Sequence, residues 1–283
     1  MQSLSNKVVV ITGAASGIGR ALALHLAGRG CRLLLADLNA TGLAETAALA
    51  LRQTPAAEIV TELTDSGNEA AIFALAEVCK TRFGAADIVI NNAGVALVSS
   101  VEKLQTTDAQ WLININFWGV VHGCRAFLPQ LKTRSEALIV NVSSIFAMVS
   151  VPTQSIYNAS KAAVRGFSDA LRQELRDTPV RVLCVHPGGI KTNIVNSARM
   201  LDLTLLPLDE AQMRQNFEHN ARTTAEQAAA CIVDAIERGS TRLLIGPDAK
   251  ILDWIYRIWP ASASAWLTRL SMRMSEKYKF KHF

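Results

Sequence analysis

Short, wholly apolar runs alternate along the chain with longer segments of helical periodicity, and this alternation limits the possible folds most strongly. Runs of Val, Ile and Leu with no polar face are typical of strands buried on both sides of a sheet. Because a helix follows each predicted strand, neighbouring strands run parallel, and right-handed crossovers wind them into an open, doubly wound sheet. The predicted strands are Val8–Thr12, Arg32–Ala36, Glu58–Glu62, Asp87–Asn91, Ala137–Val142, Arg181–Val185 and Thr241–Ile245, and the predicted helices include Arg20–Gly28, Glu69–Arg82, Trp111–Leu131, Tyr157–Arg176 and Ala225–Arg238.

The pattern predicts one α/β domain over residues 5–249, built on a doubly wound, parallel, seven-stranded Rossmann-like sheet. Half of the 283 residues are apolar, which is enough to fill a core of that size. Residues 250–283 differ in composition, because they hold seven basic and two acidic side chains and so carry the whole net charge of +5. We therefore predict a separate C-terminal amphipathic, basic, helical extension.

Several protein classes do not fit the sequence. The first seven residues lead straight into the first strand, so we expect no signal peptide, and no apolar run reaches the roughly 18 residues of a membrane-spanning helix. The basic excess comes without a nucleic-acid-binding motif, so nucleic acid is not an expected partner. The cysteines lack the spacing of zinc ligands, so we expect no metal and free thiols in a reducing, cytoplasmic compartment. These cysteines are Cys31, Cys79, Cys124, Cys184 and Cys231.

A glycine-rich turn, Thr12–Gly19, joins the first strand to the first helix with the spacing G-x-x-x-G-x-G. Glycine permits positive φ and close backbone approach, and a helix start presents free N–H groups and a positive dipole end. The turn is therefore a candidate cradle for a pyrophosphate, and a purely structural tight turn is the alternative.

Asp37 ends the second predicted strand, about 20 residues beyond the glycines. A carboxylate at this place can accept hydrogen bonds from the adenosine ribose hydroxyls and would repel the 2′-phosphate of NADP. Asn39, and no basic residue, follows it by two positions. The sequence therefore favours NAD as cofactor, with NADP as the alternative, while a capping Asp in a solvated turn is the structural reading.

Tyr157 and Lys161 are four residues apart on a predicted helix and therefore share one face. A lysine cation and an oxidised nicotinamide nearby would lower the pKa of the phenol from its ordinary value near 10. Ser144 ends the fifth predicted strand, thirteen residues before the tyrosine. We expect these three side chains to form a proton-exchange site.

Seven motifs follow one another in a single order along the chain. They are Thr12–Gly19, Asp37, Asn91–Gly94, Asn116, Ser144, Tyr157 with Lys161, and Pro187–Gly188 with Ile190 and Thr192. In this order they resemble the short-chain dehydrogenase/reductase family across nearly all of residues 5–249.

The resemblance implies a role for each of four predicted catalytic residues. Tyr157 would exchange a proton with the substrate oxygen, and Ser144 would donate a hydrogen bond to that oxygen. Lys161 would bind the nicotinamide ribose and tune the tyrosine, and Asn116 would help hold a water that links the lysine to solvent. The neighbours that compete for two of these roles are Ser143 and Asn114.

The resemblance also implies contacts with the whole length of a dinucleotide. The adenine contact falls at Leu63, because Glu62-Leu63 stands where the family often has an Asp-hydrophobic pair. Asn92 is expected to be structural. The predicted cofactor-binding residues are Gly13, Ser16, Gly17, Ile18, Gly19, Asp37, Leu63, Asn91, Ala93, Gly94, Tyr157, Lys161, Pro187, Gly188, Ile190 and Thr192.

Residues 190–222 form an unusually long predicted connection that is rich in large apolar side chains. In the family this segment covers the substrate, so its composition suggests an apolar lid over a lipophilic secondary alcohol or ketone. Packing into the core or against a second subunit is the alternative. The apolar residues are Ile194, Val195, Met200, Leu201, Leu203, Leu205, Leu206 and Leu208.

In the C-terminal extension, apolar residues fall at helical spacing as far as Pro260, which we expect to end that helix. Three of the five tryptophans lie here among the basic residues. This composition fits a peripheral contact with anionic lipid at the inner membrane surface, and an arm packed on a neighbouring subunit is the alternative. The two apolar stripes are Ile251, Leu252, Ile255, Ile258 and Trp259, then Trp266, Leu267, Leu270 and Met274.

Together these features predict an oxidoreductase that transfers a hydride directly between a nicotinamide cofactor and a lipophilic secondary alcohol or ketone. Long helices at 111–131 and 157–176 resemble the dimer-forming pair of the family, so we expect a homodimer or homotetramer. An NADP-dependent 3-oxoacyl reductase is the alternative enzyme. A nucleotide-binding scaffold without catalytic activity is the alternative from another class.

Overall fold

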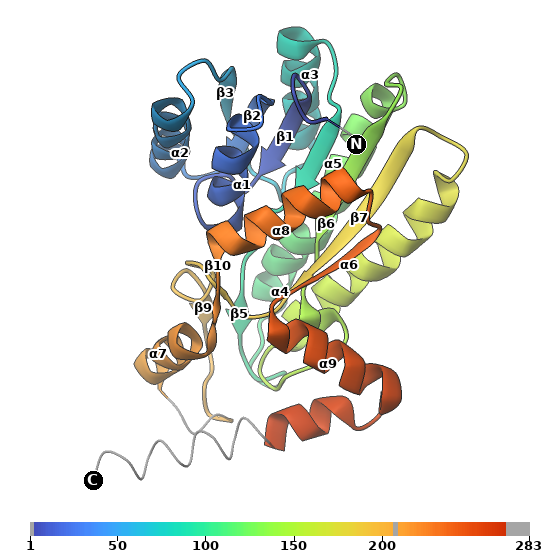
Figure 1. The fold of residues 1–283 in the computed structure, drawn as a ribbon. Coiled ribbons are helices and arrows are strands. Elements are labelled where there is room, and N and C mark those ends of the chain that lie inside the picture. The colour runs from blue at the N-terminus through green and yellow to red at the C-terminus, as the bar shows by residue number, and fades with distance from the viewer. Residues whose placement is uncertain (1–2, 206–208, 270–283) are drawn as a thin grey trace.

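A computed structural model describes residues 3–205 and 209–269 of the chain. Seven parallel strands form the central sheet in the order β11-β7-β6-β4-β1-β2-β3, which confirms the predicted doubly wound, Rossmann-like architecture (Figure 1). The strands are β1 (Val8–Thr12), β2 (Arg32–Asp37), β3 (Ile59–Leu63), β4 (Ile88–Asn91), β6 (Ala137–Val142), β7 (Val180–Pro187) and β11 (Arg242–Ile245).

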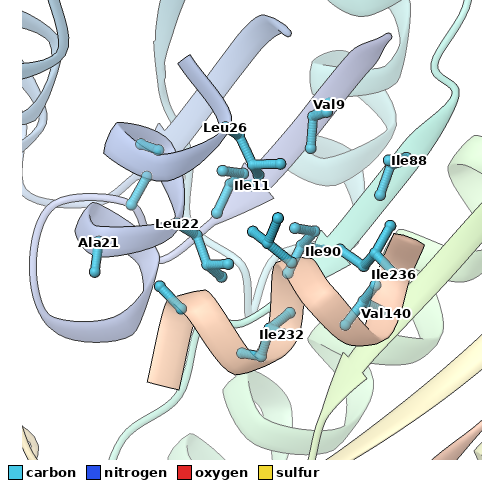
Figure 2. Close-up of a cluster of buried hydrophobic side chains, with 14 of the residues drawn as sticks. Val9, Ile11, Ala21, Leu22, Leu26, Ile88, Ile90, Val140, Ile232 and Ile236 are labelled. Carbon is cyan, nitrogen blue, oxygen red and sulfur yellow. The ribbon is translucent and has the colours of Figure 1, made fainter. Parts of the chain in front are cut away.

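Helices cover both faces of the sheet and bury its apolar side chains. On one face Ile11 and Ile90, which are partners in the β1–β4 register, meet Leu22 of α1 and Ile232 of α8 (Figure 2). A second cluster joins the opposite face to the other layer of helices. The first layer consists of α1 (Gly17–Ala27), α2 (Ala40–Gln53) and α8 (Ala225–Arg238), and the second of α3 (Glu69–Phe83), α5 (Gly119–Leu131) and α6 (Ser155–Glu174).

The strand order reverses at β1, which lies between β4 and β2. Crossovers on the two sides of such a point diverge to opposite faces of the sheet and leave a crevice beyond the carboxyl ends of the strands. The predicted glycine turn follows β1 directly and therefore lies in this crevice.

The predicted continuous helix over 111–131 is wrong in one respect. The chain forms α4 (Thr106–Ile113), then one π-helical turn, η1 (Asn114–Trp118), and then α5. Single π-turns often mark functional sites because the extra residue redirects a side chain. Here the turn places Asn116 in the interior, with no exposed surface.

The connection over 190–222 is more structured than a plain loop. It holds β8 (Ile190–Lys191), β9 (Arg199–Met200) and α7 (Glu210–Asn220), and β10 (Thr223–Thr224) follows it directly. Strand β9 pairs with β5 (Leu97–Val98), and β10 pairs with β8. Beside β9, Ser100 donates a hydrogen bond to Asp202, so the middle of this segment is tied to the loop after β4.

The helix α9 (Pro247–Ile258) runs through the predicted domain boundary at residue 249. Its inner side chains Ala249, Leu252 and Ile255 belong to a third apolar cluster, together with residues of the short 3-10 helix η2 (Ile145–Ala147). A second helical segment at 263–269 adds Ala263 to this cluster. The first part of the extension is thus packed on the main fold and is not a detached tail.

Some predicted features lie outside the described residues, namely Leu206 and Leu208 of the lid and Leu270, Met274 and the remaining basic residues of the extension. No helix in the part of the chain that the structure describes is long and apolar enough to span a membrane.

Candidate active site

The glycine turn between β1 and α1 requires glycine for two different reasons. Gly13 has φ +68°, and a Cβ atom on it would lie 2.8 Å from the Cα of Ala93. A Cβ atom on Gly19 would lie 2.0 Å from the carbonyl oxygen of Gly13. The turn is therefore folded tightly onto the start of its own helix, which leaves the N–H groups at that helix end facing the crevice.

The helix start is suited to a phosphate group. Ser16 is the N-cap residue of α1; its exposed side chain makes no capping hydrogen bond. Thr192 lies directly opposite, since a Cβ on Gly17 would be 3.1 Å from its Cγ2. Ile18 turns partly into the core. A cleft of about 490 Å³ borders this contact and is lined by residues of α1, of the segment after β8 and of α7, among them Gly17, Leu24, Thr192 and Phe217.

Asp37 faces the glycine turn from the end of β2. Its Oδ2 accepts a hydrogen bond from the Ala15 N–H and its Oδ1 accepts one from the Asn39 N–H, both at 2.9 Å. Leu63 is its register partner on β3 and is 65% exposed. Arg20 lies near this carboxylate, but its guanidinium donates hydrogen bonds to the Ala15 carbonyl at 2.6 Å and to side chains of α2. The carboxylate is thus the charged group fixed at this end of the crevice.

The side chains of Ser144, Tyr157 and Lys161 meet at the carboxyl end of β6. The Lys161 ammonium lies 5.8 Å from the centre of the Tyr157 ring and donates to the Val142 carbonyl at 3.1 Å. The Ser144 hydroxyl is hydrogen-bonded to the tyrosine and accepts from the Phe146 N–H at 3.1 Å. The three groups of the predicted proton-exchange site are therefore neighbours.

Ser143, the alternative to Ser144, points the other way. It is buried, and its hydroxyl donates to the Lys161 carbonyl at 2.8 Å. This bond fastens α6 to the end of β6 and so holds the lysine and the tyrosine in register with the serine that faces them.

The pKa values of Tyr157 and Lys161 depart from what the sequence suggested. Burial raises the pKa of Tyr157 above its ordinary value, and the hydrogen bond from Ser144 opposes this only in part. Burial also lowers the pKa of Lys161 to about 8. The expected lowering of the tyrosine pKa is thus not a property of the chain alone, and the positive charge of an oxidised nicotinamide would have to supply it.

Asn116 lies next to the lysine because of the π-turn. Its Oδ1 accepts from the Val95 N–H at 2.8 Å and its Nδ2 donates to the Val95 carbonyl at 2.9 Å. A Cβ on Gly94 would lie 3.3 Å from both the Asn116 Oδ1 and the Lys161 Nζ. Asn114, its competitor, faces the turn at residue 67 instead.

The Asn91 side chain does not reach the crevice. It is buried and donates to the Asn141 Oδ1 at 2.8 Å inside the sheet, so only its backbone could touch a cofactor. Asn92 bonds the carbonyls of Thr12 and Gly13 through its Nδ2, as a structural residue would. The Ala93 N–H donates to the Thr12 Oγ1 at 3.2 Å, which closes the crevice floor between β1 and β4.

The segment expected to contact the nicotinamide starts at Pro187, the last residue of β7. The Gly188 N–H donates to the Ile245 carbonyl of β11 at 2.9 Å. Ile190 is buried and begins β8, which carries the chain on to Thr192. The segment is thus tied to the sheet at its start and faces α1 at its end.

Asp248, at the start of α9, is a residue that the sequence reasoning missed. Its Oδ2 accepts a hydrogen bond from the Gly189 N–H at 2.6 Å, and a Cβ on Gly188 would lie 2.2 Å from the same oxygen. The carboxylate therefore fixes the shape of the segment after Pro187. The signal in the sequence was Gly246-Pro247-Asp248 directly after a predicted strand, which is a typical helix start.

His186 was also missed. It is buried on β7, its Nδ1 lies 3.3 Å from the Ser144 carbonyl oxygen, and burial lowers its pKa to about 4. A neutral imidazole therefore supports the backbone of Ser144. Among the residues described by the structure, His, Cys, Asp and Glu do not gather into a group that could hold a metal ion.

Comparison with known proteins gives matches over most of the chain. Residues 7–201 match the short-chain dehydrogenase family model. The SadH protein of Mycobacterium tuberculosis is 42% identical over 265 residues, which cover 93% of this chain and 94% of that protein. Dehydrogenase/reductase SDR family member 7B of Mus musculus is 36% identical over 204 residues, 70% of this chain and 62% of that protein.

A solved structure extends the likeness to the whole fold. A short-chain dehydrogenase/reductase from Burkholderia phymatum, crystallised in complex with NAD, is 29% identical and superposes with a TM-score of 0.81, covering 92% of this chain and 98% of that one. The family model, the M. tuberculosis relative and this structure lead to one conclusion: the chain belongs to the short-chain dehydrogenase/reductase family and is an NAD(P)-dependent oxidoreductase.

Proposed function

We propose that the protein oxidises a lipophilic secondary alcohol with NAD, or catalyses the reverse reduction of a ketone, with Tyr157 as general acid and base. The observation that carries the proposal is the meeting of Ser144, Tyr157 and Lys161 beside the glycine turn. A nicotinamide bound in the crevice exchanges the hydride with the carbon atom of the substrate.

The chain supplies the proton chemistry. In the oxidation, the Tyr157 oxygen takes the hydroxyl proton of the alcohol, and in the reduction it returns a proton to the carbonyl oxygen. The Ser144 hydroxyl donates a hydrogen bond to the same substrate oxygen, where negative charge develops. Lys161 would add its charge to that of an oxidised nicotinamide in favouring the phenolate, and Asn116, which is buried beside the lysine, would help hold a water that links the lysine to solvent.

NAD is the proposed cofactor because Asp37 stands where the adenosine ribose would lie. Its carboxylate is held by two backbone N–H groups, so it cannot easily turn away from a 2′-phosphate. Steady-state kinetics with both nucleotides should give a higher kcat/KM with NAD. An equal or higher value with NADP would contradict this assignment.

A lipophilic substrate is supported by the surroundings of the tyrosine. Phe146 packs edge-on against the Tyr157 ring, with 6.4 Å between ring centres. The large apolar residues described in the lid are not buried in the core, and Leu201 and Leu205 are 46% and 59% exposed. Side chains that the core leaves uncovered are available to line a substrate pocket.

A homodimer is part of the proposal. Trp118, at the junction of η1 and α5, is 44% exposed and stacks on His122. On α6, a Cβ on Gly166 would meet open space. The two helices therefore present surface that a second copy could cover, and sedimentation velocity would show the dimer.

The decisive experiment replaces one tyrosine and keeps another as control. Tyr157→Phe should lower kcat with a hydrophobic secondary alcohol about 10²–10⁴-fold, because the variant lacks the phenol that exchanges the proton, while NAD binding persists. Tyr256→Phe, on α9 and packed against the η2 cluster, should keep its activity. Equal turnover of Tyr157→Phe and the unchanged protein would refute the mechanism.

A further inference from the structure

The helix α9 has two different apolar faces. Its inner face, with Leu252 and Ile255, packs on the η2 cluster. A second stripe at i, i+3 and i+7 consists of Ile251, Trp254 and Ile258, which are 57%, 59% and 45% exposed. Core packing explains the inner face only, so the outer stripe needs a different explanation.

The outer stripe continues beyond the end of α9. Trp259 is 55% exposed and meets Trp254 edge-on, with 6.3 Å between ring centres. Trp266, in the helical segment that follows, is 47% exposed. Thirteen large apolar side chains are exposed in the described part of the chain, and these five belong to one stretch of sixteen residues, which we call the tryptophan face.

Positive charge accompanies the tryptophan face. Lys250 is one helical turn before Trp254 and Arg257 is one turn after it, and both are exposed. Arg257 and Arg242 share a single carboxylate, that of the buried Asp253, so a positive charge remains. Arg269 is also exposed.

We propose that the tryptophan face docks the protein on the surface of an anionic lipid bilayer. Indole rings are amphipathic and favour the level of the headgroups, and basic residues beside them are attracted to anionic lipid. A second copy of the chain fits less well, because two positively charged faces would oppose each other. Shallow insertion of one helix face also needs no membrane-spanning segment.

The helix that carries this face packs close to Ser144. Residues 145–149 follow Ser144 and form the cluster on which α9 packs, and the Ser150 N–H donates to the Ser264 Oγ at 2.9 Å. Figure 1 shows α9 at the same end of the molecule as α7 and β9 of the lid segment. Docking would therefore bring the lid near the bilayer. Delivery of a lipophilic substrate from the bilayer rests on the proposed function, whereas the binding itself does not.

The experiment measures sedimentation of the full chain with vesicles of phosphatidylglycerol and phosphatidylcholine, and with vesicles of phosphatidylcholine alone. The unchanged protein should sediment with the anionic vesicles and much less with the others. The double variant Trp254→Ser/Trp259→Ser should bind at least tenfold more weakly. Leu51→Ser, which removes an exposed apolar side chain from α2, should bind like the unchanged protein.

Charge is tested by reversing it at one position. Lys250→Glu should weaken binding to anionic vesicles, whereas Lys80→Glu on α3 should not. Should the double tryptophan variant unfold, a loss of binding at high salt by the unchanged protein still tests the electrostatic part. The proposal is refuted if the unchanged protein does not sediment with anionic vesicles, or if the double variant binds them as tightly as the unchanged protein does. It is also refuted if that variant instead dissociates a dimer in sedimentation velocity.

Discussion

At the scale of single residues, the contact between Asp248 and Gly189 links α9 to the segment that should hold the nicotinamide. A hydrogen bond to an ionised carboxylate contributes roughly 1.5–3 kcal/mol. We predict that Asp248→Ala raises the KM for NAD about tenfold or more, because the segment after Pro187 loses its fixed shape. Steady-state kinetics and titration of nucleotide binding would measure this.

Asp248→Asn is the matched control, since its amide oxygen can still accept from the Gly189 N–H. It should retain most of the nucleotide affinity. If the residue only stabilised the start of α9, both variants would lower Tm and leave the KM for NAD unchanged, which would contradict a positioning role.

The residues near one another in sequence were the predictable part of the site. Tyr157 and Lys161 share a helix face because of their spacing, and the structure places Ser144 beside them. Asp248 is 59 positions from its partner Gly189, so no local pattern could reveal the contact. The inward turn of Asn91 depends on Asn141, a strand away.

At the scale of elements, α9 separates two kinds of apolar position. Leu252 faces the η2 cluster, whereas its neighbour Ile251 is 57% exposed. We predict that Leu252→Ala lowers the free energy of unfolding by about 1–3 kcal/mol, because it leaves a gap against the helix that follows Ser144. Denaturant unfolding would measure the change.

Ile251→Ala is the control on the same helix and should change that free energy by less than about 0.5 kcal/mol. Similar losses in the two variants would mean that α9 does not pack as described. The extension would then be detached from the main fold, as the sequence predicted.

The strands were predictable because most of them are apolar at nearly every position and all seven pair within one sheet. Other elements were not. The helix α2 buries only Gly42, Leu43, Thr46 and Ala50, a weak signal for a periodic pattern. The π-turn at Asn114–Trp118 depends on the hydrogen bonds of Asn116 to the Val95 backbone, which a helical pattern cannot show.

At the scale of the whole molecule, burial of Lys161 makes global stability depend on pH. Its pKa is about 8 when folded, against an ordinary value of 10.5. Below pH 8 the lysine is protonated in both the folded and the unfolded protein, and burial of its charge lowers the free energy of unfolding. Between these two pKa values the unfolded chain binds more protons, so this group makes the protein more stable as pH rises.

Lys161→Met removes this dependence on pH. The prediction therefore concerns the difference in free energy of unfolding between the unchanged protein and the variant. From pH 8 to 9 the unchanged protein should gain about 1 kcal/mol relative to the variant in denaturant unfolding. Buried thiols, whose pKa values burial raises, act in the opposite direction, and the comparison cancels them. A constant difference across this range would show that the lysine is not buried as a cation.

The packing of α1 against α8 has a consequence for how the chain is made. The helix at 17–27 emerges from the ribosome early, yet the side chains of Ile232 and Ile236 that cover Leu22 and Leu26 come about two hundred residues later. Until then, one face of the newly made nucleotide-binding half stays open to water. Chaperones are therefore expected to bind the nascent chain until residue 238 has left the exit tunnel. For the same reason, the first half of the chain is a poor candidate for expression on its own.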